Sequence, residues 1–316
     1  MRTPSLSRRQ VVHAAALASA GIVLAPFVPA CAQTAPQGDP ITKPIPSTGE
    51  RIPVIGVGTN QYSVDAPEQI AALQEVLEKM IELGGSVVDT ARAYGRSEEV
   101  IGELMQRIGK RDRFFISTKT PIGGELRAPE VEVQAAFDRL KVDKIDLMLI
   151  HNLFGLDQLM PALIDAKAKG RVRYIGMSTS TDEQYAGLMD GMRKYPLDFI
   201  QVDYSIANRG AAEAVLPLAQ ERKMAVLVNM PFGGRRDAAA VFGQVADRPL
   251  PDFAADIDAA SWAQFFLKYV VSHPAVTAAI PGTTRVSHMI DNQGAGRGRL
   301  PDEAMRREME RYWDAL

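Results

Sequence analysis

The sequence of 316 residues contains a single cysteine, Cys31, and this scarcity excludes several classes of protein. One cysteine cannot form an intrachain disulfide, and no cluster of cysteine and histidine residues has the spacing of a metal site. We therefore expect neither a disulfide scaffold nor a bound metal. The stability of the fold must come from a hydrophobic core.

Long runs of one charge are also missing. The 36 basic and 38 acidic residues leave a formal net charge of -2, and no basic run in the body of the chain indicates binding to nucleic acid. With 46% hydrophobic and 23% charged residues, the composition is that of an ordinary folded domain. This composition excludes disordered and fibrous proteins. We also expect the protein to be a monomer.

The first 32 residues are predicted to be a signal peptide. They contain no acidic residue, and the apolar run at 14–28 is too short to span a bilayer comfortably. Residues 7–12 (SRRQVV) resemble a twin-arginine export motif, although a general secretory signal is the alternative. We therefore expect export to the periplasm or beyond, with a linker at 33–40. Attachment to a membrane is expected only if Cys31 is lipidated.

From residue 54 onward, short apolar runs alternate with longer amphipathic segments. The runs have the length of buried strands and the segments have helical periodicity. Strands are expected at 54–58, 86–88, 114–118, 145–150, 172–177, 199–202, 225–228 and 277–280. Helices are expected at 67–83, 98–108, 129–140, 156–169, 182–195, 211–222 and 261–271, and Gly84 and Gly170 are expected to end two of them.

This alternation predicts an α/β fold, a (β/α)8 TIM barrel over residues 41–316. A doubly wound open sheet is the alternative, but it requires a glycine-rich turn that leads directly into a helix, which GVGT at 56–59 does not do. A short β-hairpin is expected before the barrel, around the turn at 47–50, and an external C-terminal helix at 301–313. The connection at 233–260 is too long for an ordinary turn and is expected to be a functional loop insertion.

Three consecutive strands end at ionisable residues, Asp89, Lys119 and His151. Polar strand ends are common where strands meet solvent, but in a barrel these positions converge on the rim where active sites lie. Tyr94 follows on the loop after the second strand. A phenol is a weak acid, with a pKa of about 10, and a nearby ammonium such as Lys119 makes it a better proton donor. Asp89 would keep Lys119 charged, and a neutral His151 could bind a substrate oxygen.

The motifs around these residues resemble the aldo-keto reductase family in order and spacing. They are GVGT at 56–59, DTARAYGRSE at 89–98, STK at 117–119 and IDLMLIH at 145–151, and the resemblance covers residues 41–293. It implies a catalytic tetrad in which Tyr94 donates the proton and Asp89, Lys119 and His151 support it. It also implies an NADPH cofactor across the rim of the barrel, with NADH left open.

The same resemblance assigns cofactor contacts along the rim. Ser178 and Gln201 would bond the amide of the nicotinamide, Arg285 the 2′-phosphate, and Asn292 the adenine. The full set of expected contacts is Gly58, Thr59, Ser178, Gln201, Asn229, Gly282, Thr283, Arg285, His288 and Asn292.

The chain departs from the family pattern at several of these positions. Thr179 stands where asparagine is common, and Asn229 stands where an aromatic ring usually stacks on the nicotinamide. His288 falls where many members have an arginine. Arg235 and Arg236 lie in the long connection. They either bind the pyrophosphate of the cofactor or are exposed to solvent on the loop.

Together these features predict an NADPH-dependent oxidoreductase that reduces small aldehydes or ketones to alcohols. The alternative is a cofactor-binding sensor or partner subunit with little turnover. A twin-arginine pathway, through contact of the signal peptide with the export machinery, would move the protein already folded around its cofactor.

Overall fold

The computed structural model describes residues 38–121, 127–233 and 237–316. The expected signal peptide with Cys31, the first part of the expected linker, and the pair Arg235 and Arg236 lie outside the described residues.

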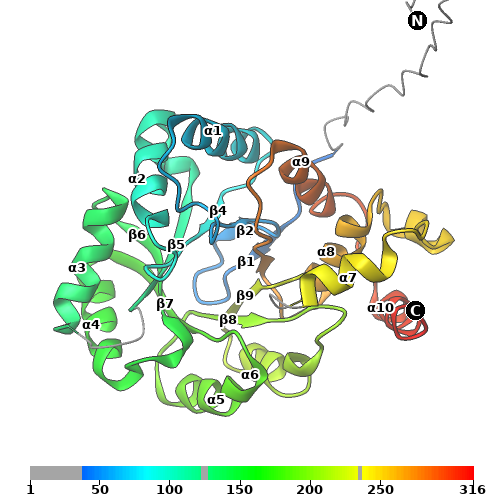
Figure 1. Ribbon diagram of the computed structural model, residues 1–316. Helices are drawn as coiled ribbons and strands as arrows, with labels where there is room; N and C mark the ends of the chain where they lie inside the picture. Colours follow the sequence, from blue (N-terminus) through cyan, green and yellow to red (C-terminus); the bar gives the residue numbers. More distant parts are fainter. Residues whose placement is uncertain (1–37, 122–126, 234–236) are drawn as a thin grey trace, which may run out of the picture. The chain divides into compact units, whose positions relative to one another are not determined.

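Eight parallel strands form a barrel, as Figure 1 shows. Each strand pairs with its neighbours in sequence, and bridges of Ile55 to Ala279 and of Gly58 to Gly282 join the first strand to the last. The strands are β3 (Val57–Gly58), β4 (Val87–Asp89), β5 (Phe115–Thr120), β6 (Ile145–Ile150), β7 (Val172–Ser178), β8 (Phe199–Asp203), β9 (Ala225–Asn229) and β10 (Ala278–Ala279). The TIM barrel predicted from the sequence is confirmed.

The apolar residues of the strands separate into two layers because side chains alternate between the faces of a strand. One layer fills the barrel, and its rings of Phe115, Tyr174 and Phe199 contact one another at centroid distances of 5.5–6.0 Å. The other layer lies between the strands and the surrounding helices. The interior is therefore a solid core, and functional side chains are left to the rim.

A β-hairpin closes the barrel at the end where the strands begin. It consists of β1 (Thr42–Pro44) and β2 (Arg51–Pro53), as expected. Ile45 and Ile52 are buried in the interior layer, and the Tyr174 hydroxyl donates to the Glu50 carboxylate over 2.5 Å. The Lys43 ammonium donates to the carbonyls of Val271 and His273, at the end of helix α8 (Trp262–Ser272).

The outer helices surround the strands in Figure 1. They are α1 (Pro67–Glu82), α2 (Ser97–Ile108), α3 (Pro129–Leu140), α4 (Leu156–Ala168), α5 (Tyr185–Lys194), α6 (Val215–Glu221), α8 (Trp262–Ser272) and α9 (Val286–Ala295). Gly84 has φ of +81° after α1, which is a left-handed conformation suited to glycine at a helix end. None of the described helices is both long and apolar enough to cross a membrane.

The connection at 233–260, expected to be a loop, contains helix α7 (Asp237–Val245) and the 3-10 helix η5 (Asp252–Ile257). Phe242 on α7 packs edge-on against Phe266 of α8, at a centroid distance of 5.8 Å. Val241 and Val245 on the same helix are buried, and this apolar face explains why the segment is helical. Helix α9 was likewise not expected, because its sequence lacks a strong apolar periodicity.

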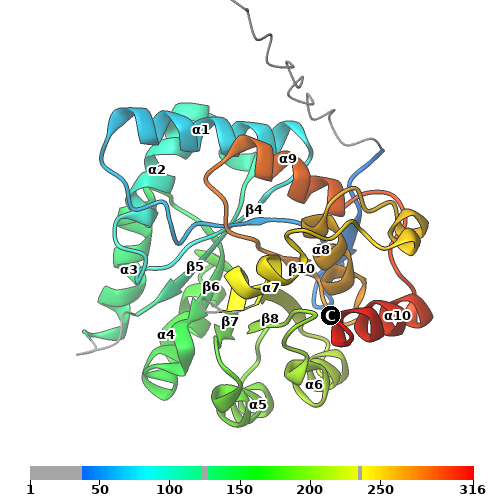
Figure 2. The same cartoon turned by 45° about the vertical axis from the view of Figure 1, so that its right-hand side comes forward.

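The expected external helix is α10 (Glu303–Asp314), which lies outside the ring beside α8, as Figure 2 shows. Its Arg306 is buried, with one guanidinium nitrogen donating to the Tyr204 hydroxyl at 2.6 Å and its charge over the Tyr269 ring. This contact fixes the C-terminal helix to the residue that directly follows β8.

Candidate functional site

The two-residue repeat of the strands determines which side chains reach the rim. Val87 in β4 and Phe115 in β5 belong to the interior layer, so the same face leads to Asp89 and Lys119 at the strand ends. Leu149 in β6 leads in the same way to His151. The three predicted residues therefore lie together where the strands finish.

Asp89 and Lys119 form a buried ion pair. Lys119 Nζ lies 2.5 Å from Asp89 Oδ2, and the two side chains are 2% and 3% exposed. The ammonium also donates to the Thr90 carbonyl at 2.8 Å. Asp89 Oδ1 accepts from Ser117 Oγ at 2.8 Å and from Gln201 Nε2 at 2.9 Å. Both carboxylate oxygens thus have donors, as a charge removed from water requires.

The environment keeps Lys119 protonated. Burial alone lowers the pKa of an ammonium, but the Asp89 carboxylate and the Tyr94 phenol outweigh burial and raise the pKa of Lys119 above its ordinary value. Lys119 Nζ lies 5.1 Å from the centre of the Tyr94 ring. A fixed positive charge therefore lies beside the phenol.

Tyr94 and His151 meet edge to face above this ion pair. Their ring centroids are 6.1 Å apart and the planes are nearly perpendicular, at 89°. Burial, and then the Lys119 charge, lower the pKa of His151 to about 4. The imidazole is therefore neutral near pH 7, with one nitrogen as donor and the other as acceptor.

A chain of amide groups crosses the rim from Asp89. Gln201 on β8 donates to Asp89 on β4, the strand on the opposite side of the barrel. Asn229 Nδ2 donates to Gln201 Oε1 at 3.4 Å and to the Thr179 carbonyl at 2.9 Å. The structure therefore brings Gln201 and Asn229 into one network with the ion pair.

Ser178 lies at the end of β7, beside this network. Its hydroxyl donates to the Ile150 carbonyl at 3.3 Å and accepts from the Asn152 backbone N–H at 3.2 Å. Gly176, two residues earlier on the same face, has no space for a side chain because an added Cβ would lie 2.1 Å from the Phe199 carbonyl oxygen.

Four of the predicted cofactor contacts lie at the junction of the first and last strands, and their own contacts stabilise the rim: Gly58, Thr59, Gly282 and Thr283. The Thr59 hydroxyl donates to the Asp89 carbonyl at 3.0 Å, which fixes the backbone of Asp89. An added Cβ at Gly58 would lie 2.9 Å from the Ile280 carbonyl oxygen, so these strands need glycine to approach so closely. Thr283 Oγ1 accepts from the Arg285 backbone N–H at 3.1 Å and shapes the turn after β10, beside Gly282.

His288 and Asn292 lie four residues apart on one face of α9, and Arg285 is the residue that directly precedes this helix. Arg285 and His288 are exposed at its N-terminal end, and Asn292 is buried further along. An exposed arginine at a helix N-terminus is suited to an anionic group.

Ser117 is a member of the network that received no role from the sequence. It lies two residues before Lys119 on the same strand face, and this spacing is the signal that could have identified it.

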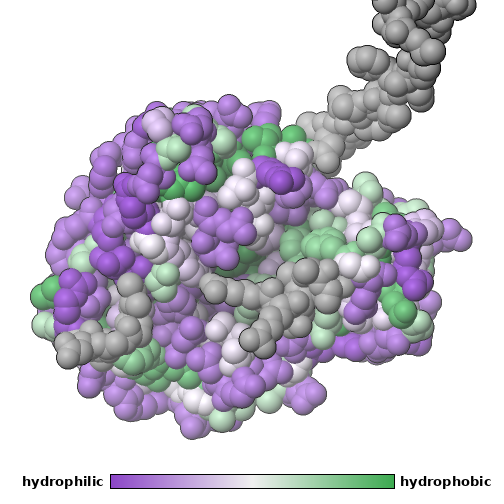
Figure 3. Space-filling model, viewed as in Figure 1, coloured by the Kyte–Doolittle hydropathy of each residue, from purple (hydrophilic) through white to green (hydrophobic). Residues whose placement is uncertain are grey.

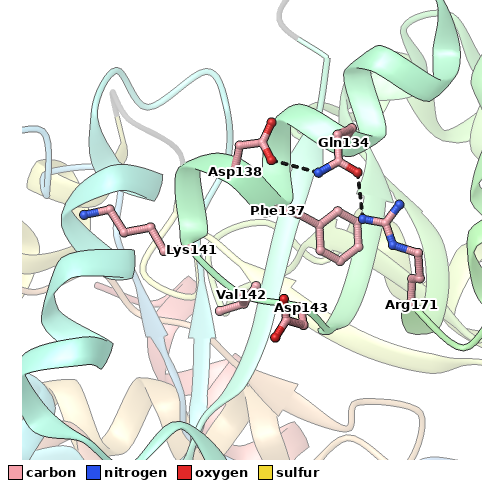
Figure 4. A pocket seen from close by; sticks show the side chains of 7 residues that line it. All are labelled: Gln134, Phe137, Asp138, Lys141, Val142, Asp143 and Arg171. Carbon is pink, nitrogen blue, oxygen red and sulfur yellow. Dashed lines mark hydrogen bonds between the residues drawn. The ribbon is translucent and has the colours of Figure 1, made fainter.

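Among the described residues, no group of three or more His, Cys, Asp or Glu side chains is arranged to hold a metal ion. A hollow of about 460 Å³ lies elsewhere, between α3 and the turn before β7, as Figure 4 shows. Its residues include Phe137, Lys141 and Arg171, and the last two precede strands β6 and β7. It therefore lies at the opposite end of the strands from the rim.

On the face that Figure 3 shows, hydrophobic and hydrophilic residues are interspersed around a central hollow.

Comparison with known proteins gives consistent matches. Residues 54–310 match the model of the Aldo/keto reductase family. The aldo-keto reductase yakc of Schizosaccharomyces pombe, whose name specifies NADP(+), is 25% identical over 301 residues, 81% of this chain and 87% of its own. Aldo-keto reductase YhdN of Bacillus subtilis is 32% identical over 170 residues, about half the length of each protein.

Among solved structures, an aldo-keto reductase from Klebsiella pneumoniae in complex with NADPH superposes with a TM-score of 0.71 and 25% identity, over 87% of this chain and 96% of that one. The barrel, the hairpin and the family match over residues 54–310 confirm the resemblance predicted from the sequence: this chain belongs to the aldo/keto reductase family and is an oxidoreductase.

Proposed function

We propose that the protein reduces a small aldehyde or ketone to the alcohol, with Tyr94 as the proton donor and Asp89, Lys119 and His151 as its supports. The observation that carries this assignment is the buried Asp89–Lys119 pair, with its ammonium 5.1 Å from the centre of the Tyr94 ring. Burying the Lys119 ammonium costs free energy because the charge loses its hydration. A reaction in which a negative charge develops on the phenol oxygen explains why the ammonium lies there.

The residues of the rim fit a nicotinamide cofactor. Among the described residues, the Thr179 hydroxyl and the Asn229 amide oxygen are buried polar groups without a hydrogen-bond partner, and they lie where Ser178 and Gln201 also present polar groups. Arg285 and His288 stand exposed at the start of α9, where a phosphate would be stabilised. The relatives whose names specify NADP(+) or NADPH support the phosphorylated form, and NADH is left open.

A nicotinamide cofactor held by these residues would supply the hydride that carbonyl reduction requires. Tyr94 Oη gives its proton to the carbonyl oxygen, and the ammonium of Lys119 stabilises the phenolate that remains. The neutral His151 donates a hydrogen bond to the same oxygen and orients the carbonyl. Asp89 holds Lys119 in position and charged.

The test is Tyr94→Phe, which removes only the hydroxyl. Carbonyl reduction should fall by a factor of about 10² to 10⁴, the usual contribution of a general acid, while cofactor binding and the unfolding midpoint stay unchanged. Tyr195→Phe is the matched control, because that tyrosine bonds to Asp157 on the surface. Wild-type turnover in Tyr94→Phe, followed as NADPH oxidation with a panel of small aldehydes, would remove Tyr94 as proton donor. An absence of turnover in the wild type would instead favour a sensor or partner subunit.

We further propose that the enzyme acts outside the cytoplasm, after export by the twin-arginine signal at 7–12. The support is the sequence of this segment alone: paired arginines, no acidic residue, and a short apolar run.

A further inference from the structure

Three buried hydroxyl groups meet where the loop that carries Tyr94 begins and ends, and we call them the hydroxyl cluster: Thr59, Thr90 and Ser97. Ser97 Oγ lies 2.9 Å from Thr90 Oγ1 and 3.0 Å from Thr59 Oγ1, and all three residues are 0% exposed. The Ser97 hydroxyl donates to the Thr59 carbonyl at 3.0 Å. Because a hydroxyl has one proton, Ser97 must accept from Thr90, and this bond joins the two ends of the loop.

Helix capping does not explain the position of Ser97. Serine at the start of a helix commonly accepts a hydrogen bond from a backbone N–H of the first turn. Ser97 is the first residue of α2, but its hydroxyl bonds to Thr59 and Thr90, which both lie outside the helix. The bond between Thr90 and Ser97 therefore closes the loop at 90–97.

The hydroxyl cluster also connects this loop to the buried ion pair. Thr90 makes two of the connections, because its hydroxyl donates to Ser97 and its carbonyl accepts from Lys119 Nζ at 2.8 Å. The Thr59 hydroxyl donates to the Asp89 carbonyl at 3.0 Å. Both ends of the loop are therefore held against the residues that form the pair.

Tyr94 is held within the loop by its backbone. Its N–H donates to the Ala91 carbonyl at 3.0 Å, and its carbonyl accepts from the Ser97 N–H at 3.2 Å. The Tyr94 side chain is only half-buried, so its position depends on the backbone that carries it. A shift of Ser97 would therefore displace the phenol relative to Lys119.

We propose that the hydroxyl cluster, centred on Ser97, positions Tyr94 for proton transfer by holding the loop at 90–97 against Lys119. This inference rests on the proposed function and adds a positioning residue to it, since Ser97 acts through Tyr94 and not on the substrate. Proton transfer requires the phenol within hydrogen-bond distance of the carbonyl oxygen. A displacement of about 1 Å can lower the rate by about 100-fold.

The experiment is a double-mutant cycle of Ser97→Ala and Tyr94→Phe in the full-length protein, followed as NADPH oxidation with the small aldehyde that the wild type reduces fastest. Ser97→Ala alone should lower kcat by about 10- to 100-fold, and it should leave the Kd of NADPH and the KM of the aldehyde within about twofold. In the Tyr94→Phe background, the same change should lower the remaining rate by less than about twofold, because no proton donor is left to misplace. A serine that only stabilised the fold would lower the rate by the same factor in both backgrounds.

Two substitutions of Thr90 test the same bond from its other end. Thr90→Val keeps the shape of the side chain without the hydroxyl, so kcat should fall as it does in Ser97→Ala. Thr90→Ser keeps the hydroxyl and should retain most of kcat. Thr277→Val is the matched control, because this buried threonine precedes β10 and its hydroxyl accepts from the Val226 N–H at 3.1 Å. It should leave kcat unchanged even if it lowers the Tm.

Wild-type kcat in both Ser97→Ala and Thr90→Val, or equal losses in the two backgrounds, would overturn the inference and leave the proposed function intact. Wild-type turnover in Tyr94→Phe would overturn both. The Tm of each variant shows whether it folds, and Thr90→Val decides the question if Ser97→Ala does not fold. Failure of both to fold would show that the bond supports the whole barrel, and would also overturn the inference.

Discussion

Replacement of Lys119 by methionine tests the electrostatic basis of the site, because it removes the ammonium but keeps a stem of similar length. The change leaves Asp89 buried without its counter-charge. Removing one partner of a buried pair typically costs about 3–5 kcal/mol, because the remaining charge is uncompensated. Asp89 keeps its donors Ser117 and Gln201, so we expect the lower part of this range, about 3 kcal/mol.

A loss of this size is smaller than the total stability of most domains, which is roughly 5–15 kcal/mol, so the variant should still fold. Its free energy of unfolding is measured in urea at pH 7 by tryptophan fluorescence. The double variant Asp89→Asn, Lys119→Met removes both charges and should recover much of the loss, since the neutral amide no longer needs a cation. Arg307→Met is the control, because its pair with Glu303 is exposed and should contribute less than about 1 kcal/mol.

Two results would contradict this reasoning. Lys119→Met could be as stable as the wild type, which would mean that Asp89 is solvated or neutral and that the pair is not a buried ion pair. The double variant could be as unstable as the single one, which would mean that Lys119 acts through packing and not through charge.

Three further predictions concern other parts of the chain. Arg285→Ala should weaken NADPH binding by about 1.5–3 kcal/mol and leave NADH nearly unchanged; titration of both cofactors checks this, and equal losses would remove Arg285 from the phosphate site. Replacing Arg8 and Arg9 together by lysine should hold the folded protein in the cytoplasm, as fractionation would show, whereas continued export would exclude the twin-arginine route. Burial lowers the pKa of His151 from 6.5 to about 4, so between these pH values the unfolded chain binds a proton that the folded protein does not. The contribution of His151 to the free energy of unfolding should therefore be at its full value above pH 6.5 and decline as the pH falls toward 4. Between pH 7 and pH 5, the free energy of unfolding in urea should fall less for His151→Asn than for the wild type. His273, whose pKa is also lowered to about 4, contributes the same pH dependence to both proteins. Identical losses in the two proteins would show that His151 is not the cause.

Several features of this protein follow from the order of residues alone. A two-residue repeat is local, so the apolar runs that end at Asp89, Lys119 and His151 predict both the strands and the face on which these side chains lie. The alternation of runs and helices predicts the barrel because parallel strands require crossovers. The motifs around Asp89, Lys119 and His151 were enough to identify the family, which the family match confirms.

Other features depend on contacts between residues that are distant in sequence. The bond from Gln201 to Asp89 joins residues 112 positions apart and exists only because closure of the barrel brings β8 opposite β4. The bond from Asn229 to Gln201 extends the same network to β9, and no local pattern contains it. Helix α7 depends on the packing of Phe242 against α8, which is why its segment resembles a loop in the sequence. The pKa of His151 is lowered by burial and by Lys119 across the rim, because burial and electric fields depend on which groups the completed fold brings together.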